Sequence, residues 1–474
     1  MNDSSSLRRS WLSERLLMAA LIMAVLLAAL YLGQHASILW LGLIFSILGS
    51  LVLLGRPALG LALAVVVALF VPLEVNTGTT VRLTAIALFI PLLSLLWLLD
   101  MVRRRTHLVA SRTNLPLLLF LVMGLVSLLV GIVTWDPTVP RNANFTLVQL
   151  AQWGIFVLSA LAFWLTANLI RNEAQLERLT WIFLWLAGIL ALVSAVTGAG
   201  VLVDRVTTVA LIRPPFWVLL TGLSAGQALF NARLSRSKRI YLGAVLLAVL
   251  FYAFVQQRES VSNWVGVTAT LAVLLWLRIP RVRGIIVVLL VAAMLTGILF
   301  PTVYDFAGGD AEWQESGGSR LVLIERVVSV TMRNPITGLG PAAYRPYTSM
   351  QPLPYGHALW ITPQVNSHNN WVDLFSHVGL VGVGLFLWFV LEVIRSAQAV
   401  RSQQQDGFRA GFASGMLATW IGALVIMLLA DWILPFVYNI GFEGFPASVL
   451  LWLFLGGLVV LEQLPLGQLN EEGQ

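Results

Sequence analysis

Long apolar runs separated by short polar gaps extend along almost the whole chain. About 20 apolar residues in helical conformation cross the roughly 30 Å hydrocarbon core of a bilayer. Fourteen runs of suitable length lie at 14–32, 36–54, 58–73, 82–100, 115–134, 147–170, 178–198, 209–230, 240–257, 261–277, 283–300, 372–394, 410–433 and 446–462. The pattern therefore predicts an all-α, polytopic integral membrane protein with about fourteen transmembrane helices.

Composition supports this class of protein. Of the 474 residues, 58% are hydrophobic and 11% are charged, whereas soluble domains are roughly a quarter charged. Arg8 and Arg9 precede the first run as they would in a signal peptide, but the run is long for one, and we expect it to remain as a span. With no cysteine in the chain, disulfides, thiolate metal sites and thiol nucleophiles are excluded.

The cationic side chains alternate between the gaps. Twenty of the 29 lie in every second gap, which the positive-inside rule assigns to the cytoplasm, together with both termini. The predicted location is the cytoplasmic (inner) membrane. This bias, with attraction to lipid headgroups, accounts for the net charge of +7 without a nucleic-acid partner. The nine expected on the outer face are Arg82, Arg141, Arg205, Arg213, Arg258, Arg320, Arg326, Arg333 and Arg345.

One long interruption, 301–371, divides the chain into an N-terminal bundle of eleven spans, 1–300, and a C-terminal bundle of three, 372–474. Loops of this length are usually functional, and this one is expected on the extracytoplasmic face. Within it, residues 320–332 have the spacing of a short amphipathic helix that lies on the membrane. Asn334-Pro335 should end that helix, and Gly338 and Gly340 permit a tight turn.

Four sequence elements in and after this loop resemble the bacterial O-antigen ligase and O-antigen polymerase superfamily. They are Ser319-Arg320, the run Asn334-Pro335-Ile336-Thr337-Gly338-Leu339-Gly340, His368-Asn369, and Gly379-Leu380-Val381-Gly382. Two positions depart from the family pattern. Arg213-Pro214-Pro215-Phe216 replaces an Asn-containing element, and His377 stands where an acidic residue is common.

The resemblance implies a glycosyltransferase with its active site on the outer face. It would move a glycan from an undecaprenyl or other polyprenyl diphosphate carrier to the hydroxyl of a glycan or glycolipid acceptor, with no cofactor and no metal. Besides these two substrates, membrane lipids are the expected partners. The reaction would be a single displacement that inverts the anomeric carbon.

Three arginines are candidates for holding the diphosphate, because a guanidinium binds phosphate oxygens in a bidentate manner. Arg213 and Arg258 lie at the outer ends of spans, against the charge bias. The alternatives are snorkelling to headgroups or a pair between Arg258 and its neighbouring Glu259. Arg320 would contact the sugar or the phosphate, or be a solvated helix end. For the arginines at 326, 333 and 345 we expect solvation or headgroup contact.

His368 is the candidate general base, because its ordinary pKa lies near neutrality. Asn369 would orient the imidazole or cap the next helix, whereas His357 and His377 have no comparable context. A metal site is disfavoured, because the histidines lack ligand spacing and the outer acids lie in a run that reads as solvated. Those acids are Asp305, Asp310, Glu312 and Glu315.

Two alternative functions remain open at this stage. A repeat-unit polymerase would use the same chemistry on a carrier-linked acceptor. A transporter or flippase for lipid-linked glycans would instead place charged residues in the middle of spans and often show internal repeats. In this chain the charges stay at span ends and the longest feature is a loop.

Overall fold

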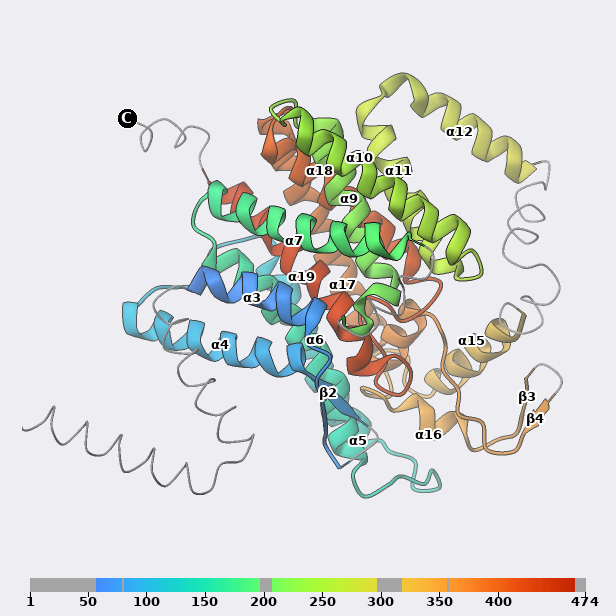
Figure 1. Ribbon diagram of the computed structural model, residues 1–474. Coiled ribbons are helices and arrows are strands. Elements are labelled where there is room, and N and C mark those ends of the chain that lie inside the picture. Colours follow the sequence, from blue (N-terminus) through green and yellow to red (C-terminus); the bar gives the residue numbers. More distant parts are fainter. Residues whose placement is uncertain (1–56, 79–80, 197–206, 296–317, 356–357, 465–474) are drawn as a thin grey trace, which may run out of the picture. The chain divides into compact units, whose positions relative to one another are not determined.

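The computed structural model describes residues 57–78, 81–196, 207–295, 318–355 and 358–464 (Figure 1). These belong to one compact unit, Pro57–Gln474. The expected spans at 14–32 and 36–54 therefore lie outside the described residues, as do Arg205, His357 and the four outer acids at 305–315.

Within the described residues, most of each apolar run from residue 58 onward lies on a helix. The helices, with their short neighbouring elements, are α3 (Pro57–Phe70), α4 (Ala85–Arg104), α5 (Asn114–Val133), α6 (Phe145–Leu169), α7 (Glu173–Ser194), the 3-10 turn η1 (Val209–Ile212), α9 (Pro214–Phe230), α10 (Arg236–Phe251), the π-turn η2 (Tyr252–Gln256), α11 (Val261–Arg278), α12 (Pro280–Leu295), α15 (Gly318–Thr331), α16 (Tyr344–Thr348), α17 (Asn370–Gln403), α18 (Phe408–Ile426) and α19 (Gly441–Gln463).

Nine helices in the described part of the chain are long and apolar enough to cross a membrane. They are α4, α5, α6, α7, α10 continued by η2, α11, α17, α18 and α19. The prediction of a mainly helical, multi-pass membrane protein is thus confirmed. Helices α3, α9 and α12, of 14, 17 and 16 residues, fall short of that length, so the total of fourteen spans stays a prediction.

In the described residues, two pairs of short antiparallel strands interrupt the helical pattern. One pairs β1 (Glu74–Asn76) with β2 (Arg82–Thr84), immediately before α4. The other pairs β3 (Leu353–Tyr355) with β4 (Ala358–Trp360) in the long loop.

The ends of several helices follow from local sequence signals. The Asn172 side chain caps α7 by accepting a hydrogen bond from the Gln175 amide at 2.9 Å, and Glu173 adds a negative charge to the first turn. Pro214 and Pro215 open α9, where missing amide hydrogens cost nothing. Helix α4 ends where Arg105 adopts a left-handed conformation with φ 52°.

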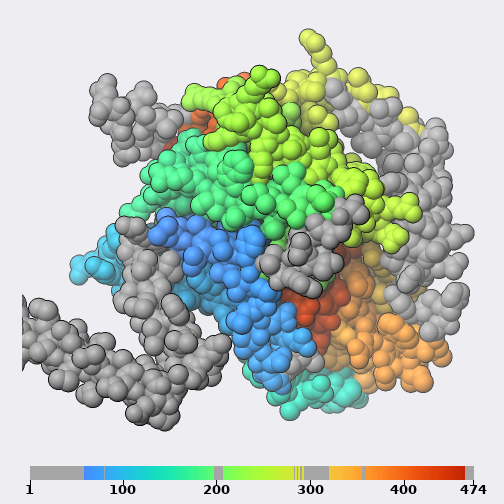
Figure 2. Space-filling view, in the orientation of Figure 1, coloured from blue at the N-terminus to red at the C-terminus, as the bar shows by residue number. Residues whose placement is uncertain are grey.

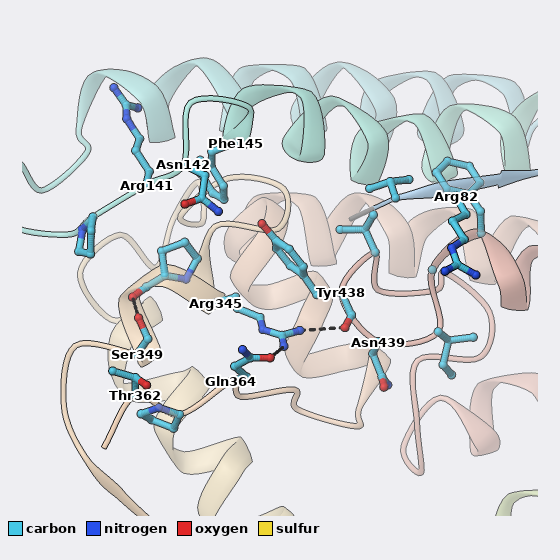
Figure 3. A pocket seen from close by; sticks show the side chains of 18 of the residues that line it. Arg82, Arg141, Asn142, Phe145, Arg345, Ser349, Thr362, Gln364, Tyr438 and Asn439 are labelled. Atoms are coloured by element: carbon cyan, nitrogen blue, oxygen red, sulfur yellow. Dashed lines mark hydrogen bonds between the residues drawn. The ribbon is translucent and has the colours of Figure 1, made fainter. Parts of the chain in front are cut away.

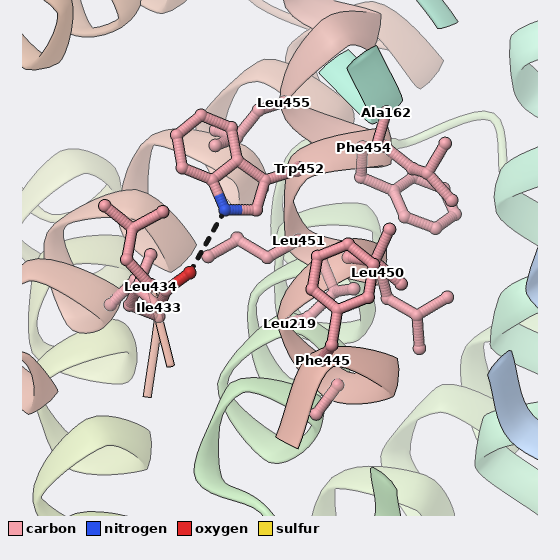
Figure 4. Close-up of a cluster of buried hydrophobic side chains, with 14 of the residues drawn as sticks. Ala162, Leu219, Ile433, Leu434, Phe445, Leu450, Leu451, Trp452, Phe454 and Leu455 are labelled. Atoms are coloured by element: carbon pink, nitrogen blue, oxygen red, sulfur yellow. Dashed lines mark hydrogen bonds between the residues drawn. The ribbon is translucent and has the colours of Figure 1, made fainter. Parts of the chain in front are cut away.

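Helix α19 forms the centre of the unit, and its whole apolar window is buried. It packs against α6, α9 and α17, and Figure 4 shows Phe445, Trp452 and Phe454 within this core. The indole nitrogen of Trp452 donates to the Ile433 carbonyl at 3.2 Å. A helix enclosed by other helices on every side needs no polar face, which explains its weak amphipathicity.

Helices α9 and α18 approach each other closely through small residues. A Cβ on Gly226 would meet the backbone of Gly411 and Gly415. Small residues at such a crossing allow backbone-to-backbone packing, a common device in membrane bundles.

Connecting segments that we expect on the same side of the membrane contact each other at one end of the bundle. At one end, Arg409 lies 3.2 Å from Glu173, and both belong to gaps assigned to the cytoplasm. At the other end, Arg333 in the long loop forms a 2.6 Å ion pair with Asp136, from the gap between α5 and α6. Figure 2 shows these two outer segments, in teal and orange, side by side. These contacts are consistent with connecting segments that alternate between the two ends of the bundle. Which end faces the cytoplasm stays a prediction.

The amphipathic helix of the long loop is α15, which starts two residues before the predicted range and ends one residue earlier. Its buried positions, Leu323, Val327 and Thr331, recur every four residues, and the helix packs on α16 and α17. This buried face therefore contacts protein. Leu321, on another face, is 61% exposed.

Candidate functional site

His368 lies at the junction of the long loop and α17. Its backbone has φ 49°, a left-handed conformation that non-glycine residues seldom adopt and that is often found at functional sites. The strained turn directs the chain into α17, which begins two residues later. The half-buried imidazole is thereby held at one mouth of the bundle.

Asn369 and Asn370 hold this junction in place. The Asn369 side chain accepts hydrogen bonds from the amides of Trp371 and Val372, and its Nδ2 donates to the Leu428 carbonyl at 3.0 Å. It is thus the N-cap of α17, one of the two roles expected for it. The Asn370 carboxamide accepts from the Ile433 and Leu434 amides and donates to the Leu434 carbonyl.

The partner of both asparagines is the segment 427–440, which joins α18 to α19. The predicted span 410–433 is too long at its end, because α18 stops at Ile426. In this segment the Asp431 carboxylate accepts from the Phe436 amide and from Asn439 Nδ2, each at 2.7 Å. Asn439 Nδ2 also lies 3.5 Å from His368 Nδ1. Segment 427–440 therefore forms a wall beside the imidazole.

Arg320 and Arg213 converge on the same segment from different helices. Arg320, in the first turn of α15, donates to the Leu429 carbonyl at 3.1 Å. Arg213, at the start of α9, lies over the Trp432 ring at 5.6 Å from its centroid. Among the described residues, the buried Nε of Arg213 has no hydrogen-bond acceptor. A buried donor of this kind is costly unless something binds it.

The surroundings of His368 keep its imidazole neutral. Burial, and next the positive charge of Arg320, lower the pKa of His368 from 6.5 to about 4. Both effects disfavour the charged imidazolium. At neutral pH the ring is therefore able to accept a proton.

Arg258 does not join this group. Its exposed side chain lies between η2 and α11, and its carbonyl accepts from the Trp264 indole at 3.0 Å. The hydrogen bonds and ring contacts that connect the other residues do not include it. Of the five predicted site residues, the structure brings together His368, Arg320 and Arg213, with Asn369 at their base.

Sequence reasoning missed Asp431 and Asn439. Asp431 lies inside an apolar run that was assigned entirely to a span, and its carboxylate is buried. An acid within such a run is itself a signal, because ionisable residues in membrane segments are expensive and commonly functional. Asn439 carries no comparable signal.

Each of the three other loop arginines contacts protein groups, and the side chain of Arg333 is also 55% exposed, as expected for a solvated residue. Arg326 donates to the carbonyls of Gln351 and Pro352, both at 3.0 Å. Arg333 pairs with Asp136. Arg345 donates to Asn366, Gln364 and the Tyr438 carbonyl at 2.8–3.1 Å. These contacts join the described part of the loop to Asp136 and to Tyr438, which precedes α19.

The motif 334–340 and the motif 379–382 form one joint. Helix α17 breaks at Gly379, where φ is 66°. The Leu380 and Val381 amides, which a continuous helix would pair internally, donate instead to the Pro335 and Ile336 carbonyls. The Ser376 carbonyl accepts from the Leu339 amide at 2.8 Å. These bonds supply partners for backbone groups that the break removes from the helical pattern.

We call His368, Arg320, Arg213 and Asn369 the His368 group. A cavity of about 690 Å³ lies beside it and is lined in part by the end of segment 427–440 (Figure 3). Its cationic lining residues are Arg82, Arg141 and Arg345, and its other polar members include Asn142, Gln364 and Asn439. Sequence reasoning did not assign this cavity, because its walls come from four separate gaps.

The described residues contain no cluster of three or more histidines, aspartates and glutamates suited to a metal ion. What they do offer is a neutral imidazole, two guanidinium groups and buried amides at one mouth of a bundle of apolar helices. The helices that are long and apolar enough to cross a membrane, in the described part of the chain, make this a multi-pass membrane protein.

Comparison with known proteins gives a family match over part of the chain. Residues 228–387 match the family model described as O-antigen ligase. The resemblance to the O-antigen ligase and polymerase superfamily is thereby confirmed, and the matched range contains Arg320, His368 and both halves of the Gly379 joint. No curated protein matches the chain. The family supports membrane glycosyl transfer of the ligase or polymerase type, with a lipid-linked glycan donor and a glycan acceptor.

Proposed function

We propose that the protein is a metal-independent, inverting glycosyltransferase of the O-antigen ligase type. It transfers a glycan from a polyprenyl diphosphate carrier to an acceptor hydroxyl on the extracytoplasmic face of the cytoplasmic membrane. The observation that carries the proposal is the convergence of neutral His368 with Arg320 and Arg213 on segment 427–440, within a chain whose residues 228–387 match the ligase family.

In this mechanism His368 takes the proton from the acceptor hydroxyl. The hydroxyl oxygen forms a bond to the anomeric carbon from the face opposite the leaving group, and the bond from that carbon to the diphosphate oxygen breaks. The electron pair leaves with the diphosphate, which needs no general acid because it is a good leaving group. One displacement inverts the anomeric centre.

Arg213 and Arg320 would stabilise the charge that accumulates on the diphosphate. Preorganised cations in a water-poor site stabilise developing charge much more than solvent does. The Arg213 Nε that lacks an acceptor among the described residues is available to a phosphate oxygen. That Arg258 also binds the diphosphate remains a proposal that rests on the sequence alone.

Donor binding should strengthen the base. With a pKa of about 4, His368 of the protein without bound donor is neutral at pH 7 but is a weak base. A diphosphate beside Arg320 cancels the positive charge that contributes to this low value, so that the pKa of His368 rises toward neutrality. The base would therefore be most effective only when the donor is in place.

The Asn439 carboxamide controls which imidazole nitrogen carries the proton. If its amide nitrogen donates to both His368 Nδ1 and Asp431 Oδ1, the imidazole proton resides on Nε2. A base acting through Nε2 needs the opposite tautomer, with the Asn439 oxygen accepting from Nδ1–H and from a protonated Asp431. Burial raises the pKa of Asp431, which favours that protonated form.

A polymerase would carry out the same displacement on an acceptor that is itself linked to a carrier. The two functions differ only in the acceptor. Purified protein should be incubated with a polyprenyl diphosphate glycan and, separately, with a glycolipid acceptor or further carrier-linked glycan. The ligase proposal expects product only on the glycolipid, with inverted anomeric configuration by NMR and full activity in a metal chelator. Product only on the carrier would instead establish a polymerase, and no product with either would refute the proposal.

A further inference from the structure

The cavity beside the His368 group is assembled from segments that lie far apart in the sequence. Its volume is about 690 Å³, within the usual range for ligand pockets. Residues 81–82, 140–145, 345–349, 362–364 and 437–443 supply the walls. Polar side chains such as Asn142, Ser349 and Thr362 line much of it, which suits a hydrated ligand such as a sugar better than a prenyl chain.

The lining carries an excess of positive charge. Figure 3 places Arg141 and Arg82 at opposite sides of the cavity, with Arg345 between them. Against these three cations, Glu443 is the one acidic residue among the described lining residues. Arg82 is 59% exposed and lies at a long 3.6 Å from Glu74, and Arg141 lies over the Trp135 ring.

Arg345 is the most informative of the three. Its guanidinium is half-buried and is held by neutral oxygens, those of Asn366, Gln364 and the Tyr438 backbone. In the described part of the chain it has no carboxylate within ion-pair distance. Burying a cation without an anion is costly, so the geometry favours an anion supplied by a ligand.

The cavity and the His368 group share a wall. Asn439 lines the cavity and lies 3.5 Å from His368 Nδ1. Glu443 also lines the cavity and interacts electrostatically with Arg213. A glycan in the cavity would therefore have one end close to the proposed base.

We propose that this cavity binds the acceptor glycan through a phosphate or carboxylate that the glycan carries. The inference rests on the proposed function and adds a charge requirement to the acceptor. The diphosphate of the donor is assigned to Arg213 and Arg320, which contact Trp432 and Leu429, whereas the cavity is lined by residues 437–440 of the same segment.

Binding can be measured with a single fluorescent label, because the chain has no cysteine. Ser349→Cys, at the cavity wall, provides the attachment site. The probes are digalacturonate and glucose 6-phosphate as anionic sugars, maltose as a neutral one, and geranylgeranyl diphosphate for the donor site. We expect both anionic sugars to change the fluorescence and maltose to bind about tenfold more weakly or worse, a difference of about 1.4 kcal/mol.

The exposed arginines allow a test that leaves the fold intact. Arg82→Gln combined with Arg141→Gln should weaken digalacturonate binding about tenfold, with an unchanged melting temperature. Arg171→Gln is the matched control, because this arginine is exposed and does not line the cavity. Equal binding of maltose, no binding of the anionic sugars, or no effect of the double substitution would overturn the proposal.

Geranylgeranyl diphosphate separates the two possible sources of an anion. We expect it to bind without displacing digalacturonate, and to lose affinity in Arg213→Gln but not in the Arg82 and Arg141 double variant. Mutual displacement would assign the cavity to the donor diphosphate and refute an acceptor site. Retained transfer activity with failed sugar binding would refute this inference alone, whereas absent transfer would refute the proposed function.

Discussion

His368 shows how one backbone conformation and one neighbouring charge determine what a side chain is able to do. Its left-handed backbone positions the ring at the mouth of the bundle, and burial with Arg320 keeps the ring neutral. A sequence reveals the residue and its motif. The shift of its pKa depends on α15 and segment 427–440, which approach from far along the chain.

The first prediction at this scale concerns pH. Unfolded histidine takes up a proton near pH 6.5, whereas folded His368 does so near pH 4. Between these values the unfolded state binds more protons, so the stability of the fold decreases as pH decreases from about 6.5 to about 4. Histidine-labelled protein should give an NMR titration near pH 4 for the signal that His368→Gln removes. Over the same range, wild type should lose more thermal stability than His368→Gln.

A titration of that signal near pH 6.5 would contradict the predicted environment. Added geranylgeranyl diphosphate should move the midpoint upward, because the diphosphate offsets the charge of Arg320. An unchanged midpoint in the presence of bound diphosphate would place the donor elsewhere.

The second prediction concerns Arg213. Arg213→Lys retains the charge but loses the planar fork, and removal of a preorganised donor of this kind typically costs about a hundredfold in rate. We expect a loss of that order in transfer activity with near-normal expression. Arg258→Lys is the comparison, because the structure keeps this arginine outside the group. Wild-type turnover in Arg213→Lys would assign Arg213 to headgroup contact instead.

At the scale of elements, the joint at Gly379 is the clearest feature. The sequence motifs 334–340 and 379–382 are separated by some forty residues, yet their backbones bond directly. This joint fixes the long loop, and with it α15 and Arg320, relative to the start of α17. Packing at the joint explains why these glycines occur together.

The third prediction tests this joint. Gly379→Ala would force a Cβ against the Ile336 carbonyl at a positive φ. Such strain costs about 1–3 kcal/mol, so we expect a lower melting temperature and faster proteolysis within 334–345. Gly384→Ala is the control in the same helix, because its Cβ would meet nothing within 4 Å. A Gly379 variant as stable as the Gly384 variant would contradict the joint.

The positions of the helices could largely be predicted from the sequence, whereas the segments and side chains that pack between them could not. Apolar periodicity located the twelve runs from residue 58 onward, because a lipid-exposed or buried helix must be apolar over its length. The end of α18 was misplaced, because segment 427–440 is apolar yet non-helical, and buried hydrogen bonds from Asn370 and Asp431 satisfy its backbone. The convergence of Arg213 and Arg320 could not be predicted, since it depends on how helices pack.

At the scale of the whole molecule, the fourth prediction concerns orientation. The gaps form two sets at opposite ends of the bundle, and the cationic bias assigns one set to the cytoplasm. A cysteine at Ser235, which is exposed in the cation-rich gap, should resist a membrane-impermeant thiol reagent in intact cells. A cysteine at Met350, which is 43% exposed, should be labelled. Both should react in permeabilised cells.

The reverse labelling pattern would move the His368 group to the cytoplasmic side. Because carrier-linked glycans would then have to react before crossing the membrane, the proposed function would fail with the orientation.

The most direct test of the central claim is the rate of glycan transfer by His368→Ala at saturating donor and acceptor. General-base catalysis contributes about a hundred- to ten-thousandfold, and loss of a base affects the transition state more than the bound ground state. We therefore predict at least a hundredfold lower kcat on this scale, with the affinity for prenyl diphosphate largely retained. A variant that keeps more than about a tenth of the wild-type rate would show that His368 is not the base.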